Sequence, residues 1–357
     1  MMSIDRIPDW EQRVARGDAF WNREIIDRPF VGLTTPNRES PYPMPAPKSH
    51  ATLRERWMDA EYNAECALAW TMNTAYYGDA LPAAYPNLGP EVFSAFFGCE
   101  LDFGNGTSWS IPNLKDWSDV DKVRFSEDNE YWKKMNEMTD AFLEVGKGKF
   151  YTGLTDLHPG GDAITAFRDP YRLNIDMIEA VDEVKSLLEY VNRIYFNVFD
   201  HFCDKLIAAG QPITTWMPIP STKRWYVPSN DFSCMISKQT FDDIFLPGII
   251  DECKHTEASI YHLDGPGALQ HLDSLLAIDE LNAIQWVFGS GNGRATDWID
   301  IYKKCQAVDK GIHITAELDE LDTLMEHLQP EGVMLTISAD VDKESAEAII
   351  NKISNWR

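Results

Sequence analysis

A histidine and an aspartate stand two residues apart at the end of a hydrophobic run in the segment "SIYHLDGPG", residues 259–267. Side chains alternate between the two faces of a strand, so His262 and Asp264 are expected on one face and their apolar neighbours on the other. An imidazole beside a carboxylate can act as a general acid and base, or as two ligands of a metal ion. The structural alternative is that the pair only hydrogen-bonds to itself and to the turn at Gly265–Gly267.

A second polar cluster lies in "LTDLHPGGDAITAFRDP", residues 154–170. Asp156 and His158 directly follow an apolar run and are candidate catalytic residues. Asp162 is interpreted as the cap of the following helix. Arg168 either anchors a substrate carboxylate or pairs with a nearby aspartate, Asp169 or Asp176.

Further candidates come from "YVPSNDFSCMIS", residues 226–237, and from single aromatic residues. Asp231 is a third candidate catalytic residue. Cys234 has no adjacent cation to lower the pKa of its thiol, which favours a packing role over a reactive thiolate. Core packing explains each tryptophan equally well, but their positions near strand ends favour a substrate pocket. The candidate substrate contacts are therefore Trp216, Arg168, Trp286 and Cys234.

Short apolar runs alternate with helical patterns through most of the chain, which is typical of parallel α/β architecture. Eight such runs are the number that closes a (β/α)8 TIM barrel, whose active site lies at the carboxyl ends of the strands. An open doubly wound sheet is the alternative. The predicted strands are residues 30–34, 150–155, 213–218, 232–236, 259–263, 283–288, 312–316 and 333–337.

The whole chain, residues 1–357, is predicted to form one barrel domain. Residues 1–29 form a helical N-terminal extension, and residues 150–357 form the main part of the barrel. The long insertion between the first two predicted strands, residues 36–149, is expected to form a lid or side wall. Its Pro-rich start is read as a loop, and residues 51–77 as one long amphipathic helix.

Composition and charge exclude several classes of function. The net charge of −25 opposes binding to nucleic acid and to anionic membranes. The sequence has no apolar run near the roughly 20 residues that cross a bilayer and no targeting pattern at its start, so we expect a cytoplasmic protein. The 6 cysteines form no CxxC pair, so neither a disulfide framework nor a cysteine-based zinc finger is expected.

Three segments together resemble the uroporphyrinogen decarboxylase (URO-D) superfamily, and more closely its decarboxylase-like branch that is grouped with corrinoid-dependent methyltransferases. They are "YHLDGPGALQHLDSLLAIDELNAIQWVFGSGNG" (261–293), "GCELDFGNGTSWSIP" (98–112) and "TDLHPGGDAITAFRDPYRLNIDMIEAVDEV" (155–184). The resemblance implies a (β/α)8 barrel, in agreement with the strand count. It also implies a homodimer.

The resemblance leaves two chemistries open. Decarboxylases of this superfamily carry an arginine-rich stretch near the first strand, whereas "RPFVGLTTPNRES" here holds only Arg28 and Arg38. The methyltransferases bind zinc through a His-x-Cys pattern and a later cysteine. This chain has Asp264 in place of the first cysteine and no cysteine in the last predicted strand. A Zn²⁺ site would then consist of His262 and Asp264 with Glu317 or Asp231 as third ligand.

Three functions follow as expectations. The leading one is a methyltransferase that moves a methyl group from a small, methoxylated aromatic substrate to a corrinoid carried by a separate protein. The alternative is a decarboxylase that acts on a small carboxylic acid or a porphyrinogen without a metal. A third is a catalytically silent barrel that binds a small ligand.

Overall fold

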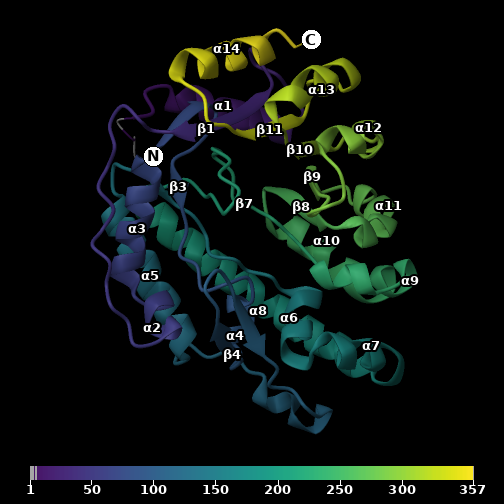
Figure 1. Ribbon diagram of the computed structural model, residues 1–357. Helices are drawn as coiled ribbons and strands as arrows, with labels where there is room; N and C mark the ends of the chain where they lie inside the picture. The colour runs from purple at the N-terminus through teal and green to yellow at the C-terminus, as the bar shows by residue number, and fades with distance from the viewer. Residues whose placement is uncertain (1–3, 5, 357) are drawn as a thin grey trace.

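The computed structural model describes residues 4 and 6–356, and its centre is a seven-stranded, mostly parallel sheet (Figure 1). The strands run in the order β2-β1-β11-β10-β9-β8-β7. Every neighbouring pair is parallel except β1 and β2, which are antiparallel. The bounds are β1 (Phe30–Pro36), β2 (Thr74–Gly78), β7 (Trp225–Tyr226), β8 (Ala258–Asp264), β9 (Ala283–Val287), β10 (Gly311–Thr315) and β11 (Val333–Ser338).

Helices follow the parallel strands and cover the outer face of the sheet, as Figure 1 shows. This places the apolar side chains of each strand between the sheet and the helices. The opposite face of the sheet points toward the centre of the molecule. The helices of this layer are α8 (Val181–Ala208), α9 (Lys238–Thr240), α10 (Leu246–His255), α11 (Leu272–Leu276), α12 (Ile299–Gln306), α13 (Leu321–His327) and α14 (Lys343–Ser354). Short 3₁₀ or π segments adjoin several of them: η3 (Phe241–Phe245), η4 (Pro266–His271), η5 (Ala295–Trp298) and η6 (Leu318–Glu320).

Strand register separates an apolar outer face from a polar inner face. Ile314 of β10 pairs in register with Leu335 of β11, and both are fully buried. In β8 and β9 the register pairs Leu263 with Trp286 on the outer face. The neighbouring register position pairs His262 with Gln285, so the inner face carries the polar side chains.

The part of the molecule opposite the parallel sheet is built from short, irregular segments. β6 (Tyr151–Thr152) pairs only with β3 (Ala83–Ala84), and the backbone N–H of Leu154 donates to the carbonyl of Thr214 at 2.8 Å. Among the described residues the sheet does not close, so a complete TIM barrel is not confirmed. Prolines at positions 212, 218, 220 and 228 lack the N–H that a continuous ladder needs, which accounts for the irregular backbone here.

The strand predictions succeed on one side of the sheet and fail on the other. The predicted runs at residues 30–34, 259–263, 283–288, 312–316 and 333–337 all contain strands. Residues 150–155 contain only the two-residue β6, and residues 213–218 form no strand. The prediction for residues 232–236 is wrong because this segment is the 3₁₀ helix η2 (Asp231–Met235).

The N-terminal part and the insertion hold the other elements. The single helix predicted for residues 51–77 is wrong: Asp59 accepts a hydrogen bond from the backbone N–H of Tyr62 and starts a new helix. The chain then forms β2 at the edge of the sheet. The elements outside the main helical layer are α1 (Trp10–Trp21), α2 (Leu53–Trp57), α3 (Ala60–Met72), α4 (Val92–Ala95), β4 (Glu100–Phe103), β5 (Ser108–Ile111), η1 (Trp117–Lys122), α5 (Glu130–Gly146), α6 (Gly160–Arg168) and α7 (Pro170–Glu179).

No helix within residues 4 and 6–356 combines the length and the apolar character that crossing a membrane requires.

Candidate functional site

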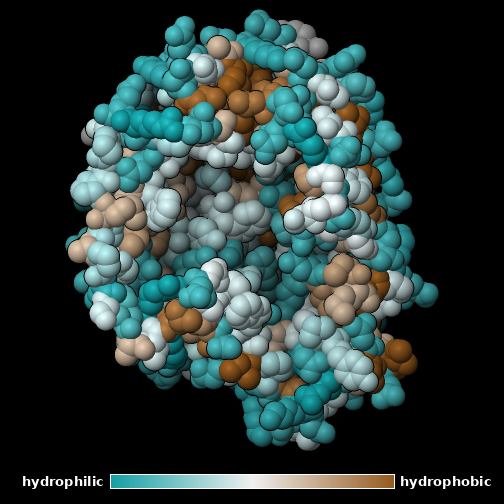
Figure 2. All heavy atoms as spheres, in the orientation of Figure 1, coloured by the Kyte–Doolittle hydropathy of each residue, from teal (hydrophilic) through white to brown (hydrophobic). Residues whose placement is uncertain are grey.

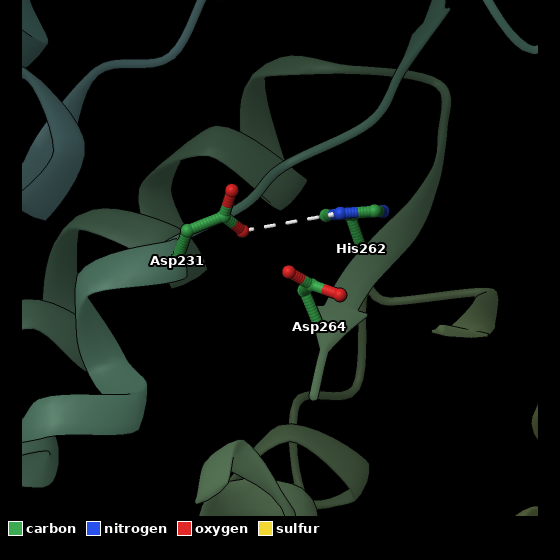
Figure 3. A group of neighbouring side chains, drawn as sticks. All are labelled: Asp231, His262 and Asp264. Atoms are coloured by element: carbon green, nitrogen blue, oxygen red, sulfur yellow. Dashed lines mark ion pairs between the residues drawn. The ribbon is translucent and has the colours of Figure 1, made fainter. Parts of the chain in front are cut away.

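His262 and Asp264 lie on the inner face at the carboxyl end of β8. Both side chains are half-buried, whereas the intervening Leu263 is buried against the helices. The strand therefore alternates as the sequence predicts. Figure 3 shows the two side chains leaving β8 on the same side.

Asp231 approaches this pair from a neighbouring segment. The backbone N–H of His262 donates to the carbonyl of Pro228 at 2.9 Å, which holds the segment that precedes η2 against β8. A carboxylate oxygen of Asp231 lies 3.9 Å from Nε2 of His262 (Figure 3). Asp231, His262 and Asp264 each offer one ligand atom, and these atoms all lie within 4.8 Å of one another. This is the donor cluster of the site.

Gln285 orients the imidazole of the donor cluster. Nδ1 of His262 lies 2.7 Å from Oε1 of Gln285, its register partner on β9. An amide oxygen only accepts, so Nδ1 donates in this contact, and Nε2 is the ring nitrogen that faces Asp231. Metal-binding histidines are commonly fixed in this way by a second side chain.

A second histidine lies deeper on the same inner face. His313 of β10 pairs in register with Gln285, and its Nε2 lies 2.9 Å from Oγ1 of Thr336. Burial, and then the nearby His262, lower the pKa of His313 to about 4. His313 is therefore neutral at the pH of the cell.

Asp162 positions the donor cluster from the other side. The prediction that Asp162 caps the following helix is wrong, because α6 has no side-chain cap. Its carboxylate instead accepts from the backbone N–H groups of Asp231 and Phe232, at 3.2 and 3.1 Å. The hydroxyl of Ser229 also donates to it, at 3.2 Å.

Asp156 and His158 form a second group beside the donor cluster. Nδ1 of His158 hydrogen-bonds to the Ser229 hydroxyl, and its Nε2 lies 4.0 Å from Oδ1 of Asp156. That oxygen is buried and has no hydrogen-bond partner among the described residues. Burial raises the pKa of Asp156, which favours its protonated form.

The carboxyl groups around His262 repel one another. Desolvation and then the charge of Asp162 raise the pKa of Asp231 to about 6, although His262 and His158 act in the opposite direction. Burial likewise raises the pKa of Asp162. Such a concentration of acidic groups is relieved by a bound cation.

The site opens into a hollow. Figure 2 shows a deep depression in the face of the molecule between the insertion and the β8 side. One cavity of about 280 Å³ includes His158, Asp162, Asp231 and Phe232 in its lining. Trp216 packs edge-on against His262 with ring centroids 5.5 Å apart, so this predicted substrate contact touches the donor cluster.

Three other predicted residues lie elsewhere. Arg168 is buried and donates two hydrogen bonds to Asp176, at 2.6 and 2.9 Å, so the pairing alternative is the one observed. Trp286 lies on the outer face of β9 and packs edge-on against Trp298 at 5.1 Å. Glu317 is exposed and caps η6, outside the donor cluster.

Cys234 lies at the rim of the site rather than in a strand. It is exposed on η2 and close to Gly267, whose Cβ, if present, would lie 3.3 Å from the Cys234 Cβ. Burial and then the charge of Asp231 raise the pKa of its thiol. The raised pKa disfavours a thiolate, but the exposed position of Cys234 does not fit the packing role that the sequence favoured.

Gln285, Ser229 and His313 are site residues that were not predicted from the sequence. A signal was available for Gln285, since it is the single polar residue within the apolar run "AIQWVF". The same alternation would have placed Trp286 on the outer face. The contact of Ser229 with His158 joins residues 71 positions apart through irregular backbone, for which the sequence carries no periodic signal.

No protein-family model matches the chain, and no curated protein matches it. Among solved structures, the chain is similar to a methyltransferase from Methanosarcina mazei, with a TM-score of 0.60 and 12% sequence identity. The match covers 96% of this chain and 98% of that one. At this identity the match shows a shared fold, one that extends over nearly the whole of both proteins.

Proposed function

We propose that this protein is a methyltransferase of the uroporphyrinogen decarboxylase superfamily that transfers a methyl group from a small methoxylated aromatic compound to a corrinoid held by a separate protein. The observation that carries the proposal is the donor cluster of Asp231, His262 and Asp264 on the inner face of the sheet, with Asp231 lining the cavity. The fold shared with a methyltransferase supports the same reaction class.

The donor cluster fits a divalent zinc ion. It combines one imidazole nitrogen with two carboxylates, all common zinc ligands, and leaves room for a fourth ligand from the substrate. Gln285 holds Nδ1 of His262, which leaves Nε2 as the ligand atom. Zinc at this position would act as a Lewis acid on an ether oxygen, and nitrogen and oxygen ligands favour that role over the activation of a thiol.

The protein's own residues would position the substrate and move a proton. Trp216 offers an aromatic edge next to His262. When an aryl ether loses its methyl group, the oxygen left behind needs a proton. Asp156 favours its protonated form, and His158 lies between it and the cavity, so this pair can supply that proton.

The residue that the decarboxylase alternative needs for substrate binding already has other partners. It requires Arg168 to hold a carboxylate of the substrate, but this guanidinium donates to Asp176 and to the carbonyls of Leu114 and Lys115. We therefore favour methyl transfer.

The test combines metal analysis with a transfer assay. We expect about one zinc per chain in the purified protein and loss of that zinc in the His262→Ala variant. With a Co(I) corrinoid protein and a panel of methoxylated aromatic compounds, the absorption spectrum should change to that of the methylated corrinoid. Released CO2 without this spectral change would support the decarboxylase, and transfer by a zinc-free protein would refute the proposed metal role.

A further inference from the structure

A second cavity lies in the insertion, among helices that Figure 1 shows across the molecule from β8. It has a volume of about 410 Å³ and lies among helices α2, α3 and α5 and residues 85–87. We call it the aromatic cavity, because its lining includes Trp57, Tyr62, Trp70, Tyr85 and Phe142.

The inner walls of the aromatic cavity are held in place. The indole N–H of Trp57 donates to the carbonyl of Gly104 at 2.9 Å, and its ring contacts Phe103. Phe142 is buried and packs edge-on against Phe150. A ligand entering here meets preformed aromatic surfaces, so little side-chain freedom is lost when it binds.

The rim of the aromatic cavity is apolar and accessible. Trp70 on α3 is 68% exposed, whereas Ala64 and Leu68 on the same helix are buried in the core. A helix with an apolar core face normally carries polar residues on the opposite face. An exposed indole beside a cavity is suited to close over a flat ring.

Arg56 is the one charged side chain in the described lining of this cavity. Its guanidinium donates to the carbonyl of Asn105 at 2.7 Å, and no carboxylate within the described residues forms an ion pair with it. By contrast, the neighbouring Arg54 pairs with both carboxylate oxygens of Glu130. A guanidinium with donors to spare is a good partner for a carboxylate ligand.

Tyr85 joins the aromatic cavity to the proposed active site. It lines the cavity, and the amide of Asn87 donates to its hydroxyl at 3.3 Å. A Cβ on Gly153 would lie 3.2 Å from the Tyr85 Cβ, so the base of this side chain packs against the segment that leads to Asp156. Burial and then the charge of Asp156 raise the pKa of the Tyr85 phenol.

We infer that the aromatic cavity binds a small aromatic carboxylate, with its ring against Trp57, Tyr62 and Trp70 and its carboxylate on Arg56. The binding itself is independent of methyl transfer. Its identification as the place where the methoxylated substrate or its demethylated product is held rests on the proposed function.

Calorimetric titration with four probes tests the binding site. We expect saturable binding of benzoate and 4-methoxybenzoate, and at least tenfold weaker binding of benzamide, which has the ring without the charge, and of cyclohexanecarboxylate, which has the charge without the ring. Arg56→Gln should weaken benzoate about tenfold and leave benzamide unchanged. Trp70→Ala should weaken both.

Two matched variants serve as controls. Arg38→Gln removes an exposed arginine that pairs with Asp340, and Tyr171→Ala removes an aromatic residue that is 76% exposed on α7. Neither should change the affinity for benzoate. Equal losses in the control variants, or no saturable binding to the unmodified protein, would overturn the inference.

A third comparison separates this inference from the proposed function. Benzoate should bind with the same affinity to the His262→Ala variant and to chelator-treated protein. Loss of binding there would place the ligand at the donor cluster instead and refute the aromatic cavity. Retained binding in a protein that transfers no methyl group would support the cavity and count only against the proposed function.

Discussion

The parallel sheet and the part of the chain opposite it are built in different ways. β1 and β8–β11 form a continuous parallel ladder with an apolar outer face. The opposite side, residues 151–159 and 211–231, consists of two-residue strands and proline-containing loops joined by isolated hydrogen bonds. We call these the regular side and the irregular side.

The candidate site takes residues from both sides. His262, Asp264 and Gln285 come from the regular side, whose ladder fixes their spacing. Asp156, His158 and Asp231 come from the irregular side, whose backbone is free of ladder constraints. The ladder thus fixes His262 and Asp264 of the donor cluster, and the loops bring Asp231, Asp156 and His158 next to them.

The largest expected difference between the sides is in metal affinity. His262→Ala removes a proposed zinc ligand from the regular side. We expect zinc affinity to fall by about 1000-fold, since each ligand carries several kcal/mol of the binding free energy. Asp231→Asn keeps an oxygen donor at a more exposed position and should have a smaller effect. Competition with a chromogenic chelator measures both. A larger loss for Asp231→Asn would mean that the irregular side dominates the binding.

The next effect concerns the residue that orients the imidazole. Gln285→Leu removes the acceptor for the Nδ1 proton of His262 while conserving approximate volume. We expect zinc affinity to fall by about 10- to 100-fold, as for other residues that support a metal ligand. Ser229→Ala, on the irregular side, is the matched control and should leave zinc affinity within a few-fold of its original value. Equal effects would show that Gln285 does not orient the ligand.

The residues of the site that the sequence predicted correctly lie mainly on the regular side. Alternation in "SIYHLDGPG" correctly placed His262 and Asp264 together, because a buried strand face excludes polar side chains. The segment around Asp231 has no periodic pattern, and its strand prediction failed where backbone N–H groups bond to Asp162 instead of to a ladder. Arg168 pairs with Asp176 across the break between α6 and α7. Residue type alone could not distinguish this pair from a substrate anchor.

Acid should lower the unfolding free energy of the protein, because His313 on the regular side is buried in its neutral form. The folded pKa of about 4 lies below the unfolded value, so the unfolded chain binds more protons between pH 4 and about 6.5. The stability associated with neutral His313 is therefore complete above that range and lost as the pH falls through it. The difference in unfolding free energy between pH 7 and pH 5 should be about 2 kcal/mol larger for the original protein than for His313→Asn.

Urea titrations in the presence of a chelator measure this difference without a metal contribution. Asp231 has the opposite sign, since its raised pKa stabilises the fold at low pH and loses that effect as the pH rises toward 6. Both proteins share this term, so it cancels in the comparison. Identical pH profiles for the two proteins would show that His313 is not held neutral.

The smallest effect concerns a buried hydroxyl on the irregular side. Oγ1 of Thr214 is buried and has no hydrogen-bond partner among the described residues. An unpaired buried hydroxyl is unfavourable, whereas valine has nearly the same shape without it. Thr214→Val should therefore leave stability unchanged or raise it by about 1 kcal/mol. Leu335→Ala on the regular side should instead lower it by about 2–5 kcal/mol. If Thr214→Val destabilises the protein, its hydroxyl bonds to an internal water, and the irregular side is a hydrated wall rather than a loosely packed one.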